Sequence, residues 1–216
     1  LVFPTALLGF TINTFQLGQV SLDRIEEIFN SQPTIFDSLD SKPLNEPVRG
    51  KIKAKNLIVK YKDSNSKALD GISFTINPGE LVAIVGPVGC GKTTLAKCLG
   101  RTIEISNDQL FLDNNDIKKV NLEDLRKNIA IVPQEAFLFT STISDNIKFG
   151  NPEAKNNIIK SSAKRAGLIE DIYNFPKGFQ TIVGERGITL SGGQRQRTAL
   201  GRALLIDSPV IVLDDA

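Results

Sequence analysis

Histidine, methionine and tryptophan are absent from the 216 residues, and only two cysteines are present. Without histidine, these residues cannot complete a mechanism that needs an imidazole base or metal ligand. The 26 basic residues barely exceed the 24 acidic ones, which excludes a nucleic-acid binder that depends on a large basic excess. A composition with 41% hydrophobic and 23% charged residues excludes intrinsic disorder, a collagen-like chain and a disulfide scaffold. This length suits one domain, with or without an appendage.

The two cysteines do not predict a disulfide. Cys90 and Cys98 lie within one expected helix, roughly 12 Å apart at ~1.5 Å per residue, which is too far for an S–S bond. We therefore expect a reducing compartment. Cys90 is either a small residue in a tight loop or, with less support, a thiolate that serves as a redox sensor.

Residues 1–22 contain no charged side chain, and acidic and basic residues begin abruptly at Asp23. Such a boundary is typical of the cytoplasmic end of a transmembrane helix. Pro4, Asn13 and Gln16 weigh against this interpretation, and a buried soluble helix is the alternative. A helical spacing of apolar residues continues beyond the boundary, at Leu22, Ile25, Ile28 and Phe29. Several prolines then mark a linker, so residues 23–48 are predicted as a helix extension and linker.

A β-rich region begins near residue 49. The runs at 51–61 and 72–76 have strand character, and continuous apolar runs of strand length follow at 81–85, 129–132 and 210–213. Helical patterns separate these later runs. Unbroken apolar strands that alternate with helices predict a parallel sheet covered on both faces. The sequence therefore predicts an α/β fold.

Residues 86–93 read GPVGCGKT and fit the pattern G-x-x-x-x-G-K-[ST]. An expected strand precedes the pattern and a helical run follows it, which is the context that a phosphate-binding loop requires. Glycines let backbone N–H groups surround the phosphates, and the helix adds the positive end of its dipole. Lys92 then neutralises the β and γ oxygens of a nucleotide, while the Thr93 hydroxyl holds Mg²⁺.

Two adjacent carboxylates follow the last apolar run, where VIVL is succeeded by Asp214 and Asp215. A carboxylate at the end of a strand can bind the Mg²⁺ that Thr93 holds, directly or through water. Alone the pattern is weak, because strands often end in aspartate. Downstream of a phosphate-binding loop it becomes strong.

Residues 191–197 read SGGQRQR and precede a helical run. Ser191 is a good N-cap, and the two glycines after it leave bare N–H groups. We therefore predict a second anion site at this helix start. A capped helix without a ligand is the alternative.

With these motifs the sequence resembles the ABC ATPase family, whose defining signatures match GPVGCGKT, LSGGQRQR and VIVLDD. The resemblance covers essentially the whole chain. It implies a P-loop NTPase of the ABC type, with a parallel sheet core, a β-rich N-terminal subdomain and a helical subdomain. It also implies that ATP and Mg²⁺ bind. The residues carried over as ATP-binding are Tyr61, Gly86, Pro87, Val88, Gly89, Cys90, Gly91, Lys92, Thr93 and Thr94.

The resemblance further implies a head-to-tail dimer in which the signature of one domain contacts the ATP of its partner. Tyr61 matches the aromatic residue that stacks on adenine, with a plain strand tyrosine as the alternative. Gln134 matches the glutamine that senses Mg²⁺ and the attacking water, and Glu185 in TIVGERG matches a coupling residue typical of exporters. The signature residues carried over are Leu190, Ser191, Gly192, Gly193 and Gln194, and the Mg²⁺ ligands are Thr93, Gln134 and Asp214.

Exporters of this type fuse six transmembrane helices ahead of the ATPase domain, so the resemblance strengthens the membrane interpretation of residues 1–22. We expect the end of the last transmembrane helix at 1–22, helix extension and linker at 23–48, and an incomplete ABC domain at 49–216 that lacks its D-loop and switch region. The expected protein is multi-pass in a bacterial plasma membrane, with a cytoplasmic ATPase domain. Its expected partners are a second half-transporter and a transported solute, and no nucleic acid.

One departure from the family concerns catalysis. Lys92, Gln134 and Asp215 are the implied catalytic residues, and Asp215 stands where active members usually carry a glutamate base. Aspartate is one methylene shorter, and a misplaced base costs orders of magnitude in rate. We therefore expect an ATPase that powers export of a drug, lipid or peptide, and hypothesise that this chain is the degenerate-site subunit of a heterodimer.

Three alternatives compete with the exporter. The first is a soluble ABC ATPase of DNA repair, chromosome structure or translation, but no heptad run fills the roughly 100 residues between Lys92 and Ser191. The second is the separate ATPase subunit of an importer, which would lack the apolar start. The third is a nucleotide sensor without turnover. Because the sequence starts without methionine and lacks the family's switch histidine, we expect a piece of a longer chain that is inactive alone.

Overall fold

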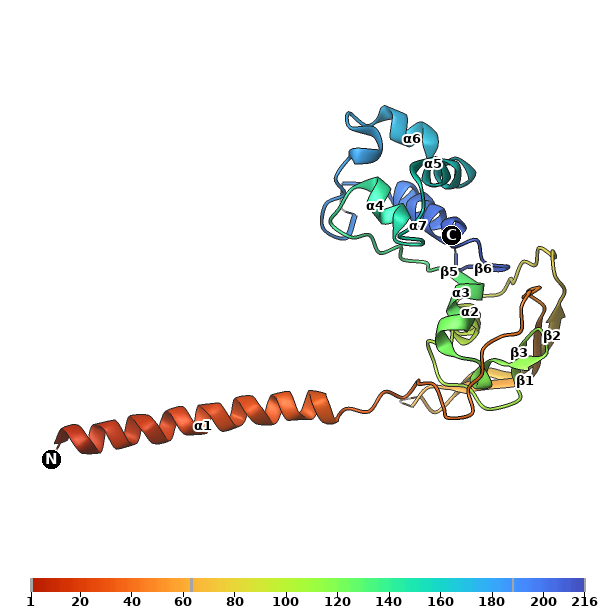
Figure 1. Cartoon of the computed structure of the whole chain (residues 1–216). Helices are drawn as coiled ribbons and strands as arrows, with labels where there is room; N and C mark the ends of the chain where they lie inside the picture. The colour runs from red at the N-terminus through yellow and green to blue at the C-terminus, as the bar shows by residue number, and fades with distance from the viewer. Residues whose placement is uncertain (1, 63, 188, 216) are drawn as a thin grey trace. The chain divides into compact units, whose positions relative to one another are not determined.

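The computed structural model describes residues 2–62, 64–187 and 189–215. These residues form two compact units, which divide between Phe36 and Asp37 (Figure 1). The first unit contains helix α1 (Val2–Asn30), and every residue of this helix is exposed. The helix continues from the uncharged segment through the charged residues after it, as the apolar spacing predicts.

Hydroxyl groups of α1 bond to the backbone of the helix itself. Thr11 Oγ1 donates to Leu7 O at 2.9 Å, and Thr14 Oγ1 donates to Phe10 O at 2.9 Å. These bonds satisfy hydroxyl groups within the uncharged part of the helix. Within the described part of the chain, no helix is both long enough and apolar enough to cross a membrane.

The second unit opens with an antiparallel sheet. Its strands are β1 (Ile52–Lys60), β2 (Lys67–Ile76), β3 (Leu110–Leu112) and β4 (Asn115–Asp116), in the order β2-β1-β3-β4. β1 pairs on both sides, since Ile52 faces Ile76 of β2 and Leu112 of β3. The sheet is the β-rich region that the sequence predicts.

A parallel strand pair forms the second sheet. β5 (Ile129–Val132) pairs with β6 (Val210–Leu213) in register, from Ile129 opposite Val210 to Val132 opposite Leu213. The predicted strands at 129–132 and 210–213 are confirmed. The nearby helical elements are α2 (Lys92–Leu99), η1 (Ile117–Lys119) and α3 (Leu122–Asn128). One buried apolar cluster joins the first sheet to α2, α3 and β5.

Helices α4–α7 lie together on one side of the β5–β6 pair, and the antiparallel sheet lies on the other (Figure 1). The elements are α4 (Ile143–Lys148), α5 (Asn156–Arg165), α6 (Ile169–Asn174), η2 (Gly178–Gln180), η3 (Glu185–Gly187) and α7 (Gly192–Ile206). They enclose a core of their own, made of Leu138, Ile143, Ile147, Ile159, Ala163, Leu168, Ile172, Val183, Leu190 and Leu205. Separately, Ala199 and Ala203 pack α7 onto Ala130 and Val132 of β5.

The strand predicted at 81–85 is wrong. This segment forms no strand, and Leu81 and Val85 are almost fully exposed. A strand needs a neighbour that accepts and donates its backbone hydrogen bonds. Among the strands in the described ranges, β5 and β6 pair only with each other and none pairs with 81–85. An apolar run therefore predicts a strand only where the fold supplies a partner.

Residues 37–48 form no helix or strand, as their prolines predict, yet they dock on the domain. Asp37 Oδ1 accepts from Leu122 N at 2.8 Å, and Asp124 Oδ2 accepts from Leu44 N at 3.2 Å. Leu44 is buried in the apolar cluster that joins the first sheet to α2, α3 and β5. These contacts tie the segment to the start of α3.

Helix α5 offers a matched test of the helical core. Ile159 is 2% exposed inside that core, whereas its neighbour Ile158 is 51% exposed. We expect Ile159→Ala to lower the free energy of unfolding by about 2–5 kcal/mol, because it removes buried methyl groups and leaves a cavity. Ile158→Ala should stay within about 0.5 kcal/mol of the unchanged chain. Urea unfolding followed by circular dichroism measures both, and equal losses would contradict the packing described.

Candidate nucleotide and magnesium site

The loop at 86–91 requires glycine most clearly at position 91. Gly91 is the N-cap of α2 and has a φ of 97°. A Cβ at this position would lie 2.5 Å from Ala68 O, a backbone atom that cannot move aside. A Cβ at Gly86 would lie 2.7 Å from Cys90 Sγ. Glycine is therefore required at position 91 for the loop to close ahead of α2, whereas a Cβ at position 86 would displace the exposed Cys90 side chain.

Lys92 folds over this loop. Its Nζ donates to Gly86 O at 2.8 Å and to Pro87 O at 3.1 Å, and it lies 3.8 Å from Cys90 Sγ. The first N–H groups of α2 have no acceptor within the helix. An ammonium group beside such amides forms a site for an anion such as phosphate.

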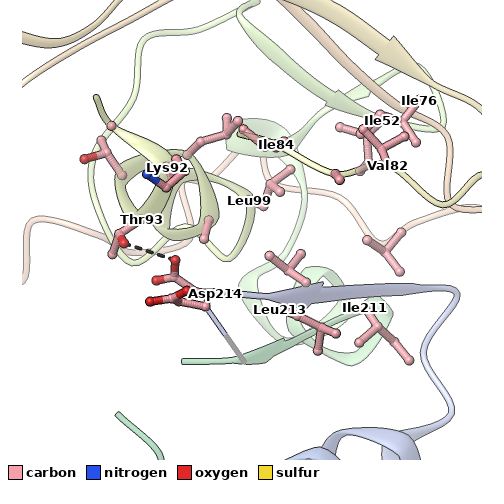
Figure 2. Close-up of a pocket in the computed structure, with 18 of the residues that line it drawn as sticks. Ile52, Ile76, Val82, Ile84, Lys92, Thr93, Leu99, Ile211, Leu213 and Asp214 are labelled. Carbon is pink, nitrogen blue, oxygen red and sulfur yellow. Dashed lines mark hydrogen bonds between the residues drawn. The ribbon is translucent and has the colours of Figure 1, made fainter. Parts of the chain in front are cut away.

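Thr93 and Asp214 meet although 121 positions separate them in the sequence. Thr93 Oγ1, at the start of α2, donates to Asp214 Oδ1, just beyond the end of β6, at 3.0 Å. Figure 2 shows the two side chains facing each other. A hydroxyl and a carboxylate are hard oxygen donors of the kind that Mg²⁺ prefers.

The chemistry of these donors fits Mg²⁺ held together with phosphate. The described residues contain no cluster of three or more His, Cys, Asp or Glu that could hold a metal ion by themselves. Mg²⁺ is usually bound through one or two carboxylates plus phosphate oxygens and water. Thr93 and Asp214 match that mode, with the remaining ligands left to the nucleotide and water.

Asp215 is held from two directions. Gln134 Nε2 donates to Asp215 Oδ2 at 3.1 Å, and Gln196 Nε2 donates to Asp215 O at 3.3 Å. Gln134 and Asp215 are thus brought together as a pair. The sequence reasoning missed Gln196, although the second glutamine of SGGQRQR was a visible signal.

Tyr61 lies directly after β1 and reaches α2. Its hydroxyl is 3.2 Å from Thr94 Oγ1, and the residue is 39% exposed. The ring is therefore placed beside the helix that follows the phosphate-binding loop, with part of its surface open to solvent. Its stacking on adenine stays a prediction.

A cavity of about 780 Å³ is lined by most of the residues predicted to bind ATP and Mg²⁺. Gly86, Pro87 and Cys90 are not among its lining residues. Its other wall is apolar, because the unpaired segment 81–84 and β6 leave side chains uncovered there (Figure 2). The predicted residues that line the cavity are Tyr61, Val88, Gly89, Gly91, Lys92, Thr93, Thr94, Gln134, Asp214 and Asp215.

The predicted N-cap at Ser191 is confirmed. Ser191 Oγ accepts from Gln194 N at 3.2 Å, and Gln194 Oε1 accepts from Ser191 N at 2.9 Å, which completes a capping box. Gly192 and Gly193 are exposed beside it. None of the signature residues from Leu190 to Gln194 lines the cavity at Lys92.

The segment before Glu185 pairs with the segment after Gln134. Ile143 N donates to Thr181 O at 3.0 Å, and Val183 N donates to Ser141 O at 2.8 Å. Glu185 itself begins η3 and is exposed. Backbone pairing thus links the stretch that follows Gln134 to the stretch that precedes Glu185.

Comparisons with known proteins agree with this geometry. A family model described as ABC transporter matches residues 69–216. The Multidrug resistance-like ATP-binding protein MdlA of Buchnera aphidicola is 38% identical over 100% of this chain and 37% of that protein. The ATP-dependent lipid A-core flippase of Aromatoleum aromaticum is 38% identical over 93% of this chain and 35% of that protein.

A solved structure extends the agreement to the fold. The structure of a bacterial Atm1-family ABC exporter with ATP bound matches with a TM-score of 0.87 and 33% identity, over 95% of this chain and 36% of that one. The chain thus spans about a third of the length of the curated relatives it matches. The α/β P-loop fold predicted from the motifs is confirmed. The chain belongs to the ABC transporter family, and its relatives include exporters.

Proposed function

We propose that this domain binds Mg²⁺–ATP at residues 86–94 and hydrolyses it to power the export of a solute across a membrane. The observation that carries the proposal is the bond between Thr93 and Asp214 at 3.0 Å. It brings a hydroxyl and a carboxylate, which are oxygen donors of the kind that Mg²⁺ prefers, beside an ammonium and a helix N-terminus. Chemistry on ATP needs these components together.

Each residue then has a task. Lys92 and the first amides of α2 hold the phosphates. Mg²⁺, once bound at Thr93 and Asp214, neutralises charge on the phosphate oxygens. Gln134 orients Asp215, whose carboxylate acts only as a weak general base toward the attacking water, because it is one methylene shorter than the usual glutamate. The hydrogen bond from Gln134 Nε2 to Asp215 Oδ2 supports this pairing.

The signature at 190–194 acts on a second nucleotide, bound by a partner domain. It is exposed at Ser191, Gly192 and Gly193 and does not line the chain's own cavity. A helix start that carries bare amides and faces solvent is suited to a phosphate supplied from outside the chain. The partner is a second half-transporter.

The exporter assignment draws on the relatives. One is named for multidrug resistance, one for a lipid flippase, and one is an Atm1-family exporter. Their shared property is transport rather than a shared solute, so the proposal extends to export and leaves the solute class open. Residues 1–22 are proposed as the end of the last transmembrane helix.

An exposed aromatic patch supports attachment to another domain. Phe137, Phe139 and Phe149 are 52%, 39% and 61% exposed, and their rings contact one another. Arg202 lies over two of these rings and bonds to Phe137 O at 3.1 Å. A contiguous exposed apolar patch marks an interaction surface. The patch follows Gln134 in the chain, and we propose that it contacts the membrane domain.

Lys92→Ala tests ATP binding. We expect the Kd for ATP to rise by about 10-fold or more, because the variant removes a charged contact to the phosphates. Fluorescent nucleotide titration measures the change. Lys97→Ala is the matched control, since it removes an exposed lysine from the same helix outside the cavity. An unchanged Kd for Lys92→Ala would rule out the assignment of the phosphate-binding loop.

Asp215 variants test the base and the asymmetric dimer together. In a pair where this chain holds the weak site, Asp215→Asn should change the rate of ATP hydrolysis by less than about threefold, because base catalysis is already poor. Asp215→Glu should raise hydrolysis at this chain's own site by about 10-fold or more, since the longer carboxylate reaches the water. Glu153→Gln controls for loss of an exposed charge. Brisk hydrolysis by a homodimer that Asp215→Asn abolishes would overturn the asymmetric assignment.

Membrane attachment separates the exporter from a soluble ABC ATPase or an importer subunit. We expect the native protein to stay in the pellet when its membranes are washed with alkaline carbonate, because a membrane-spanning domain cannot be extracted by breaking polar contacts. An integral and a peripheral membrane protein provide the two controls, followed on immunoblots. Release into the supernatant would favour the soluble alternatives.

A further inference from the structure

A carboxylate on α6 joins the signature helix α7. Asp171 Oδ1 accepts from Gln194 Nε2 at 3.1 Å. Its other oxygen, Oδ2, accepts from Arg197 Nε at 3.1 Å and from Arg197 Nη2 at 2.7 Å. Both oxygens of Asp171 are therefore in use, and both serve residues of the signature helix.

Gln194 links Asp171 to the N-cap residue of α7, Ser191. Its Oε1 accepts from Ser191 N at 2.9 Å while its Nε2 donates to Asp171. An amide group can satisfy a donor on one side and an acceptor on the other in only one orientation. Asp171 thus fixes the direction of the Gln194 amide, and the amide fixes the backbone of Ser191.

Arg197 is the second residue of α7 that Asp171 binds. A Cβ added at Gly193 would lie 3.2 Å from Arg197 Nη1, so the guanidinium rests beside the bare glycine. Asp171 holds that guanidinium through two bonds. The carboxylate is therefore connected to Gly193 as well as to Ser191.

We propose that Asp171 is a positioning residue for the signature, holding Gln194 and Arg197 so that Ser191–Gly193 keep the geometry that receives phosphate. This inference rests on the proposed function of the signature. A carboxylate is required because it offers two acceptors. An asparagine has one side-chain oxygen, which the charged Arg197 would take. The asparagine amide would then face the Gln194 amide, donor against donor.

The ionisation of Asp171 agrees with this role. Burial raises its pKa, but hydrogen bonds from Gln194 and Arg197, together with the charge of Arg197, outweigh that effect and bring the pKa below its ordinary value. The side chain is therefore ionised at neutral pH, so both oxygens act as acceptors.

The test compares Asp171→Asn with Glu170→Gln, which makes the same chemical change at an exposed position of the same helix. In the complete transporter, Asp171→Asn should lower kcat for ATP hydrolysis by about 10-fold, the loss expected for a bond to a charged group. Glu170→Gln should have no effect. Asp171→Glu keeps two acceptors and should retain activity within about threefold of the unchanged protein.

Hydrogen exchange supplies a readout that does not depend on turnover. The peptide spanning residues 190–195 should exchange faster in Asp171→Asn, because the capping box at Ser191 loosens. Arg197→Leu should lower the melting temperature and speed exchange there less than Asp171→Asn does, since the bond from Gln194 to Asp171 survives. If Asp171→Asn folds too poorly to purify, Gln194→Glu is measured in its place. This variant keeps an oxygen that accepts from Ser191 N, but it replaces the donor to Asp171 with a carboxylate that repels it.

The outcomes separate the two proposals. Exchange at 190–195 that stays as slow in Asp171→Asn as in Glu170→Gln would overturn the positioning role. Equal kcat values for these two variants would overturn it as well. A complete transporter without ATPase activity would instead overturn the proposed function, and the exchange measurement would still decide the role of Asp171.

Discussion

The bond between Thr93 and Asp214 is the contact on which the nucleotide site depends. It joins the first turn of α2 to the end of β6, and β6 in turn is fixed by its parallel pairing with β5. Asp214 N donates to Val132 O at 3.0 Å, so the backbone ladder continues up to the carboxylate. The position of the Asp214 carboxylate is thus set by strand pairing. Any change that shifted β6 would separate the carboxylate from the hydroxyl.

Much of this arrangement is predictable because its signals are local. The structure confirms the predicted strands at 129–132 and 210–213 and the N-cap at Ser191. Apolar runs and capping patterns consist of adjacent residues, so the sequence alone reveals them. Segment 81–85 fails because strand formation requires a partner that no local pattern reports. Contacts between residues far apart in the sequence cannot be predicted from a local pattern either. Asp171 carries no motif of its own, and only the folded chain brings it to Gln194.

The backbone at Asp215 offers a structural reason for its aspartate. Its φ is 55°, in the left-handed region that most side chains avoid and that aspartate and asparagine tolerate best. Gln196 binds its carbonyl while Gln134 binds its carboxylate, so both the backbone and the side chain are held. A glutamate here would gain reach toward water and lose conformational ease. Under the proposed function, local geometry and catalytic reach thus favour different residues at this position.

The capping box also determines which amides of the signature are already paired within the chain. Side-chain oxygens already accept from the N–H groups of Ser191 and Gln194. The N–H groups of Gly192 and Gly193 are then those that helix geometry leaves for an outside acceptor. Without a Cβ, these glycines allow a phosphate to approach the backbone closely. Under the proposed function, the chain therefore holds two half-sites, one at Lys92 and one at these glycines, and neither is complete until a second domain supplies the other half.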